Sequence, residues 1–131
     1  MSPLASTRQR LAVCLGLVVL TLLAYEGVRR CGFVAFDDDL FVYRNPEVRA
    51  GLAWAGVRWA FSADLLFESP NADYWTPLTI LTRMADVSLF GLDPAAHHTT
   101  NVVLHALHVV LLFLLFCVAA TALAIAAATQ G

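Results

Sequence analysis

The sequence predicts an all-α membrane protein in which two apolar helices flank an acidic, tryptophan-bearing segment. Of the 131 residues, 60% are hydrophobic and only 14% are charged, whereas a soluble domain has about 25% charged residues. The apolar excess is concentrated in two runs, residues 11–28 and 101–128. Turn signals and short amphipathic stretches separate these runs, so we expect residues 29–100 to form a loop with short helices at the membrane surface.

Charge and cysteine content argue against a nucleic-acid-binding protein and against a domain stabilised by zinc or disulfides. The positive charge is all arginine and the formal net charge is −2, so the basic surplus of a nucleic-acid binder is missing. The three cysteines have no spacing that resembles a zinc or disulfide framework. We therefore expect no nucleic-acid partner and assign no metal ligands.

The first apolar run, residues 11–28, carries no charge except Glu26 and reaches the lower limit for a bilayer span. Two arginines precede it, as in a signal peptide, but the following Tyr25–Arg30 lacks the small residues of a cleavage site. An uncleaved signal anchor is therefore favoured over a cleaved signal peptide. Residues 1–10 form the N-terminal tail. Charge does not orient the helix, because arginines flank it on both sides.

The second apolar run, residues 101–128, is interrupted only by a few polar side chains. At 1.5 Å per residue it extends roughly 40 Å, enough to cross a bilayer with tilt. A buried globular helix of this length and uniform apolarity needs a larger protein around it. We therefore predict a transmembrane helix, followed by a short tail, residues 129–131.

The loop begins with the acidic run Asp37–Asp39, which lies between aromatic residues. Adjacent carboxylates repel one another, and the plainest interpretation is a solvated turn or a helix N-terminus, where Asp is favoured. Asn45–Pro46 and Gly51 mark breaks in the chain. From Leu52, apolar and aromatic residues recur at helical spacing as far as Ala63. This pattern fits an interfacial helix and equally an ordinary packed helix.

Turn residues and helix-capping residues divide the remainder of the loop. Ser69–Asp73 has the composition of a loop, and the pattern predicts a helix over Leu78–Leu89. Gly91 is the expected C-cap of this helix, and Pro94 is the expected first residue of the next one. That next helix carries His98, Asn101, His105 and His108 on one face. Hydrogen bonds to neighbouring helices explain such a face better than a metal site, although both interpretations stay open.

Two blocks of the chain resemble a known family. Residues 33–62, FVAFDDDLFVYRNPEVRAGLAWAGVRWAFS, and residues 74–113, YWTPLTILTRMADVSLFGLDPAAHHTTNVVLHALHVVLLF, are similar to the N-terminal region of transmembrane and tetratricopeptide-repeat proteins. This family includes eukaryotic O-mannosyltransferases and many bacterial relatives, and we expect the bacterial type. The chain itself contains no helix-turn-helix repeat.

The resemblance implies a C-type glycosyltransferase, a bundle of many membrane helices with an acidic pair in its first extracytoplasmic loop. It implies transfer of a mannose-type sugar from a polyprenyl-phosphate donor to Ser or Thr hydroxyls of a protein acceptor. Asp37 is the expected general base and Asp38 its supporting or substrate-orienting partner. The other expected substrate-binding residues are Asp39, Trp75, Arg83, His97 and His98.

Three positions depart from the family pattern. Thr76 stands where relatives tend to have the histidine of a Trp-His-Pro motif, Arg83 where they tend to have histidine before Met-x-Asp, and His108 where asparagine is usual. A role of those family histidines in binding donor phosphate or metal does not transfer directly to this chain. Arg83 can still pair with a phosphate.

The resemblance also implies the setting. We expect a multi-pass protein of the cell membrane with a cytoplasmic N-terminus, and further transmembrane helices as partners besides the lipid bilayer. Two helices do not enclose a lipid-linked sugar, so we expect a fragment that is inactive alone. The cofactor is unknown, since some C-type enzymes use a divalent cation. The alternatives are a small two-span interaction protein without catalysis and a metal-binding membrane protein.

Overall fold

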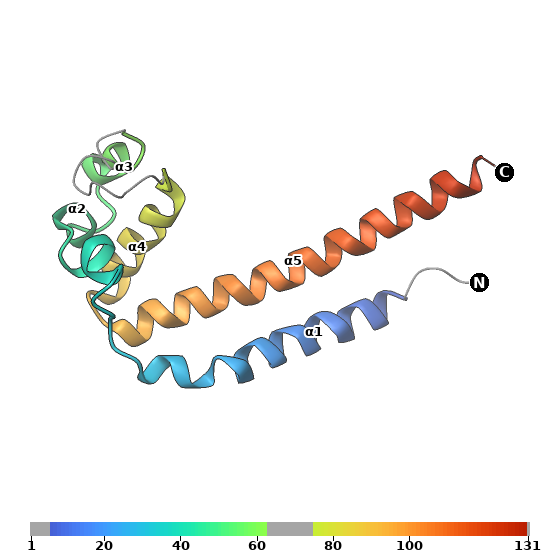
Figure 1. Cartoon of the computed structure of the whole chain (residues 1–131), viewed down its shortest axis with the longest axis horizontal. Helices are drawn as coiled ribbons and strands as arrows, with labels where there is room; N and C mark the ends of the chain where they lie inside the picture. The colour runs from blue at the N-terminus through green and yellow to red at the C-terminus, as the bar shows by residue number, and fades with distance from the viewer. Residues whose placement is uncertain (1–5, 63–74, 131) are drawn as a thin grey trace. The chain divides into compact units, whose positions relative to one another are not determined.

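The computed structural model describes residues 6–62 and 75–130, and in these residues the only regular secondary structure is helical (Figure 1). The principal helices are α1 (Thr7–Ala24), α2 (Pro46–Arg49), α3 (Trp54–Ala60), α4 (Pro77–Phe90) and α5 (Pro94–Ala128). Two helical stretches, Thr7–Arg30 and Pro94–Ala128, are long and apolar enough to cross a membrane. The predicted all-α membrane fold is confirmed. Ala63 and the predicted loop Ser69–Asp73 lie outside the described residues.

The chain divides into two compact units. Residues 1–27 and 101–131 form the unit that holds the apolar helices, which we call the membrane unit. Residues 28–100 form the second unit, which we call the loop unit. Helix α5 starts in the loop unit and continues into the membrane unit without a break in helical structure.

Helix α1 begins at a capping box in the N-terminal tail. Ser6 and Gln9 form a capping box in which each side chain accepts a hydrogen bond from the other's backbone N–H. The first helical residue is therefore Thr7, so the helix begins ahead of the predicted membrane span, residues 11–28. The α-helix ends at Ala24, and a 3₁₀ turn over Glu26–Arg30 follows.

The membrane unit exposes apolar side chains all around its helices. Leu11 and Leu15 of α1 and Leu123 and Ile125 of α5 are each more than 60% exposed. A helix that is apolar on every side needs an apolar environment, which a bilayer supplies. The Tyr25 ring meets the His105 ring edge to face, with centroids 5.3 Å apart. His105 is thus level with the end of the apolar part of α1, and the twenty residues after His108 extend about 30 Å, the thickness of the hydrocarbon core.

The loop unit has a small hydrophobic core. Its buried members come from α2, α3 and α4: Val48, Ala60, Ile80 and Met84. Phe41, Trp59, Leu81 and Val87 pack around them. Helix α3 lies close to α4 because Gly56 has no side chain: a Cβ there would lie 3.1 Å from Cε of Met84.

Local signals place the ends of these helices. The Asn45 side chain accepts hydrogen bonds from the N–H groups of Glu47 and Val48 and so caps α2. Gly91 caps α4 with φ of 65°, and Pro94 is the first residue of α5, both as predicted. Helix α4 extends the predicted Leu78–Leu89 helix by one residue at each end.

The turn between α2 and α3 is fixed against α4. Gly51 has φ of 77°, and a Cβ there would lie only 2.6 Å from Oγ of Ser88. The same Ser88 hydroxyl accepts a 2.7 Å hydrogen bond from the N–H of Leu52. This contact holds Leu52 outside the helix, so α3 starts at Trp54, two residues later than the pattern predicts.

Candidate functional site

The acidic run lies on a turn that leads into one turn of π-helix, Asp39–Tyr43. The N–H of Arg44 bonds to the carbonyl of Asp39 at 2.9 Å, five residues earlier. π-Helical turns are rare in proteins, and those that do occur are often found at functional sites. The turn buries Val42 and directs Phe41 toward the core, while Asp37 stays exposed.

The three adjacent aspartates have three different environments. Asp38 accepts a 2.8 Å hydrogen bond from the N–H of Val34, which closes the turn. Asp39 accepts from the N–H of Leu40 at 3.0 Å and lies 3.6 Å from the Arg44 guanidinium. Within the described part of the chain, the Asp37 carboxylate makes no such bond and is exposed. Asp37 is therefore the aspartate best placed to meet another molecule.

Arg83 of α4 brings a positive charge close to this run, because it lies over the ring of Phe41, whose N–H bonds to the carbonyl oxygen of Asp37 at 2.9 Å. Burial lowers the pKa of its guanidinium, and the negative charges of Asp38 and then Asp37 oppose that shift. The guanidinium carbon lies 5.2 Å from the centroid of the Phe41 ring, within the range of a cation–π contact. An arginine remains charged despite such a shift. The site thus holds a cation, partly desolvated and stacked on an aromatic ring, beside two carboxylates.

His97 lies in the interior, at the corner between α4 and α5. It is only 5% exposed, and its Nε2 lies 3.0 Å from the carbonyl oxygen of Gly91. Its Nδ1 lies 3.9 Å from Asp86, whose other carboxylate oxygen accepts a 2.7 Å hydrogen bond from the Thr100 hydroxyl. The geometry gives His97 a positioning role, and the predicted contact with substrate stays a prediction.

The segment before the aspartates is attached to the same corner. The ring of Phe33 meets the His97 ring edge to face, with centroids 5.4 Å apart. Nε2 of His98 lies 3.3 Å from the carbonyl oxygen of Gly32. Two histidines of α5 therefore hold the start of the acidic segment, while Arg83 of α4 faces its aspartates.

The structure brings some of the predicted residues together and leaves one apart. Asp37, Asp38 and Arg83 share one site, and Phe33 links that site to His97 and His98. Trp75 instead contacts Phe61 beyond the end of α3, with ring centroids 6.3 Å apart.

Sequence reasoning assigned no role to Asp86, Thr100 or Phe41, although each supports the site. A usable signal existed for Asp86, which is the only carboxylate in the apolar helix α4 and lies one turn after Arg83. Such a residue needs a partner when it is buried. The described residues contain no group of three or more His, Cys, Asp or Glu side chains that could hold a metal ion.

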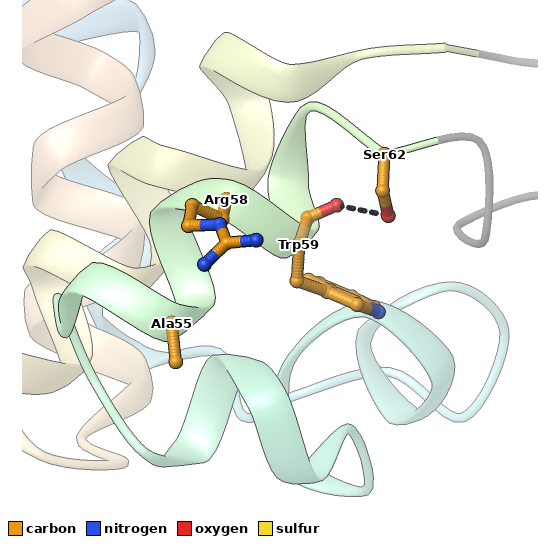
Figure 2. Close-up of a pocket in the computed structure, with 4 residues that line it drawn as sticks. All are labelled: Ala55, Arg58, Trp59 and Ser62. Atoms are coloured by element: carbon orange, nitrogen blue, oxygen red, sulfur yellow. Dashed lines mark hydrogen bonds between the residues drawn. The ribbon is translucent and has the colours of Figure 1, made fainter.

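A separate cavity of about 310 Å³ lies on α3 and is lined by Ala55, Arg58, Trp59 and Ser62 (Figure 2). The Ser62 hydroxyl donates a 2.8 Å hydrogen bond to the carbonyl oxygen of Trp59. None of the residues predicted to act in catalysis or substrate binding lines this cavity.

Comparison with known proteins finds partial similarity to enzymes named protein O-mannosyl-transferase TMTC1. Identity to the mouse (Mus musculus) protein is 33% over 78 residues, 58% of this chain and 8% of the relative. Identity to the human (Homo sapiens) protein is 32% over 81 residues, 58% of this chain and 9% of the relative. Identity to the Drosophila melanogaster protein is 31% over 105 residues, 79% of this chain and 12% of the relative.

These matches support the predicted resemblance in part. The chain spans between 8% and 12% of the length of the curated relatives it matches. No family model and no solved structure matches it.

Proposed function

We propose that this chain is part of a membrane glycosyltransferase that moves a mannose-type sugar from a polyprenyl-phosphate donor to Ser or Thr hydroxyls of proteins. The similarity to named O-mannosyl-transferases supports a glycosyltransferase-like function. The structural observation that carries the proposal is the position of Arg83 over the Phe41 ring, next to the acidic run, where the charges of Asp38 and Asp37 reach its guanidinium. A base and a phosphate-binding cation at one site are what this transfer requires.

Asp37 acts as the general base in this proposal. Its exposed carboxylate takes the proton of the acceptor hydroxyl as that oxygen attacks the anomeric carbon of the sugar. The bond between the anomeric carbon and the phosphate oxygen breaks, the phosphate leaves with the electron pair, and the configuration inverts. Because phosphate is a good leaving group, no second carboxylic acid is needed.

The neighbours of Asp37 have supporting roles. Arg83 pairs with the donor phosphate and stabilises the charge that develops on it as it leaves. Asp38 holds the turn through the N–H of Val34, which keeps Asp37 in position. Asp39, His97, His98 and Trp75 remain proposed contacts with the bound substrates.

The proposed setting is the cell membrane, with a cytoplasmic N-terminus and the loop unit outside. Two helices do not enclose a lipid-linked sugar, so further transmembrane helices complete the site and the chain alone is inactive. Within the family, the group to which the chain is proposed to belong is the bacterial type. The alternative is a small two-span interaction protein without catalysis, which would bind a partner through the exposed aromatic residues of the loop unit. Contact with the bilayer explains these exposed residues more directly.

The decisive experiment measures sugar transfer in membranes that contain the complete gene product. A radiolabelled polyprenyl-phosphate mannose donor is supplied with a peptide rich in Ser and Thr. Asp37→Asn removes the base and is expected to lower transfer by about 10²–10⁴-fold, the usual contribution of general base catalysis. Arg83→Gln is expected to raise the KM for the donor.

The matched control is Asp93→Asn. Asp93 is exposed and accepts a hydrogen bond from the N–H of Ala95 at the start of α5, away from the acidic run in sequence. Its neutralisation should leave transfer close to the wild-type rate. Undiminished transfer by Asp37→Asn rejects Asp37 as the base, and absence of transfer by the wild-type gene product rejects the proposed function.

A further inference from the structure

Helix α3 has three distinct faces. Gly56 and Ala60 are buried against the core of the loop unit. Ala55, Arg58 and Trp59 of the helix, together with Ser62 just beyond its end, line the cavity of Figure 2. Trp54, Arg58 and the C-cap residue Phe61 are exposed and form a stripe of their own. Because successive helical residues turn by about 100°, Trp54 and Arg58 lie roughly opposite the buried Gly56 and Ala60, and Arg58 joins the stripe to the cavity.

The exposed stripe is strongly aromatic. Trp54 is 76% exposed and Phe61 is 50% exposed. Trp75, which precedes α4, is 58% exposed and packs its ring edge against Phe61, so it extends the same surface. Large aromatic side chains in this number are costly to leave in water. Tryptophan is enriched where a membrane meets water, since its ring is apolar and its N–H remains hydrated.

Arg58 adds a charge to this surface at the edge of the cavity. Its side chain is exposed and lines the cavity together with the Trp59 ring. Arginine pairs with phosphate through several N–H groups at once. The loop unit is also held near a membrane by connectivity, because both its ends, residues 28 and 100, lead into the apolar helices.

We propose that α3 and the residue that caps it are a lipid-binding element: Trp54 and Phe61 insert among the headgroups of the adjoining leaflet, and Arg58 with its cavity holds the phosphate of an anionic phospholipid. The surface accounts for both interpretations of this helix, since one side packs on α4 and the other meets lipid. The proposal does not depend on the proposed transferase function.

The first test uses the fact that all three tryptophans, Trp54, Trp59 and Trp75, belong to the loop unit. The whole chain is placed in nanodiscs whose phosphatidylcholine carries bromine near the headgroup or deep in the acyl chain. A chain that retains only Trp54 is expected to lose most of its emission to the shallow bromine and little to the deep one. If iodide quenches the emission of Trp54 and neither brominated lipid does, Trp54 lies in water and the proposed insertion is rejected.

A second measurement keeps the test independent of folding. Trp59 packs against the core, so its replacement can disturb the unit. The contribution of Trp54 is therefore also taken as the difference between the wild-type chain and Trp54→Phe, which leaves Trp59 in place. The single-tryptophan chain and the difference measurement are expected to give the same depth for Trp54. If brominated lipid does not reduce the Trp54 emission obtained by difference, the proposal is also overturned.

The phosphate site is tested with Arg58→Gln. Phosphatidylglycerol is titrated into phosphatidylcholine nanodiscs while the emission of Trp59 is followed. Loss of Arg58 is expected to weaken the response about fivefold, the equivalent of about 1 kcal/mol for one arginine at a membrane surface. Arg49→Gln removes the same charge from an exposed residue of α2 that does not line the cavity, and should change the response little.

Two outcomes overturn the phosphate site. Equal weakening by Arg49→Gln and Arg58→Gln means that only general charge attracts the lipid. A shift of Trp59 emission produced by inorganic phosphate in pure phosphatidylcholine nanodiscs means that the cavity takes free phosphate rather than a lipid headgroup.

Discussion

The membrane unit and the loop unit differ in how far their polar side chains reach. In the apolar helices, Thr21 and Thr121 each donate to the carbonyl oxygen four residues earlier in the same helix. In the loop unit, Thr82 and Thr99 likewise bond within their own helices, but other side chains also reach across to another element, as Thr100 of α5 does to Asp86 of α4. A bilayer offers no water to a polar group, so a spanning helix bonds within itself. A unit outside the bilayer can use its polar groups to fix one element against another.

The two units are expected to differ most in how much stability is lost when an apolar side chain is shortened. Met84→Ala removes a fully buried side chain from the core of the loop unit, and is expected to cost about 2–5 kcal/mol of unfolding free energy. Leu123→Ala in α5 removes a side chain that touches little protein, so the loop unit should keep its stability. Denaturant unfolding in detergent, followed by tryptophan fluorescence, reports on the loop unit alone because it contains all three tryptophans.

Equal stability losses in Met84→Ala and Leu123→Ala would contradict the division into two independently packed units. A change in the emission of the native state, without a change in midpoint, would indicate a local effect on Trp59 instead.

Glycine substitutions give the next contrast. Gly51→Ala introduces a Cβ at positive φ and within 2.6 Å of Oγ of Ser88, which is expected to destabilise the loop unit by about 1–3 kcal/mol. Gly16→Ala in α1 meets no atom within 4 Å and should stabilise its helix by up to about 1 kcal/mol. Circular dichroism and the tryptophan unfolding curve separate the two effects.

The combination Gly51→Ala with Ser88→Ala divides the Gly51 effect. It relieves the contact with Oγ of Ser88 and leaves the backbone strain, but it also removes the acceptor of the Leu52 N–H. The double variant is therefore compared with Ser88→Ala alone, and its loss of stability relative to that variant should be smaller than the loss that Gly51→Ala causes in the wild-type chain. No loss relative to Ser88→Ala would show that the positive φ of Gly51 costs nothing.

Hydrogen-bond deletions give the smallest contrast. Thr100→Val removes the donor to buried Asp86 and is expected to cost about 1–3 kcal/mol, because a buried acceptor is left without that partner. Thr121→Val removes a bond to the carbonyl of Cys117, which keeps its place within the helix, so the effect should be near zero. Unfolding midpoints of the two variants at constant detergent concentration provide the measurement, and a larger effect at Thr121 would reverse the comparison.

Features encoded by neighbouring residues were predictable from the sequence. The two long apolar helices, the break at Asn45–Pro46, the Gly91 cap and the start of α5 at Pro94 all follow from short-range rules. The capping box of Ser6 and Gln9, which starts α1 at Thr7, is encoded by neighbouring residues in the same way, although it was not among the predicted features.

The candidate site was predictable only in its residue types. The sequence singles out Asp37, Asp38 and Arg83, but the contact of Arg83 with Phe41 depends on how α4 packs against the acidic segment. The hydrogen bond between Leu52 and Ser88 joins residues 36 positions apart. Such contacts leave no periodic trace along the chain, so pattern reasoning does not find them.

The π-helical turn of Asp39–Tyr43 has a consequence for how this segment tolerates insertions and deletions. A π turn accommodates one residue more than an α turn, so deletion of Leu40 would allow the chain to close as an α-helix. Because each helical residue rotates the chain by about 100°, the residues before the deletion would then point in another direction. Asp37 and Asp38 would keep their identity and lose their orientation toward Arg83. The spacing of this segment is therefore as much a part of the site as its carboxylates.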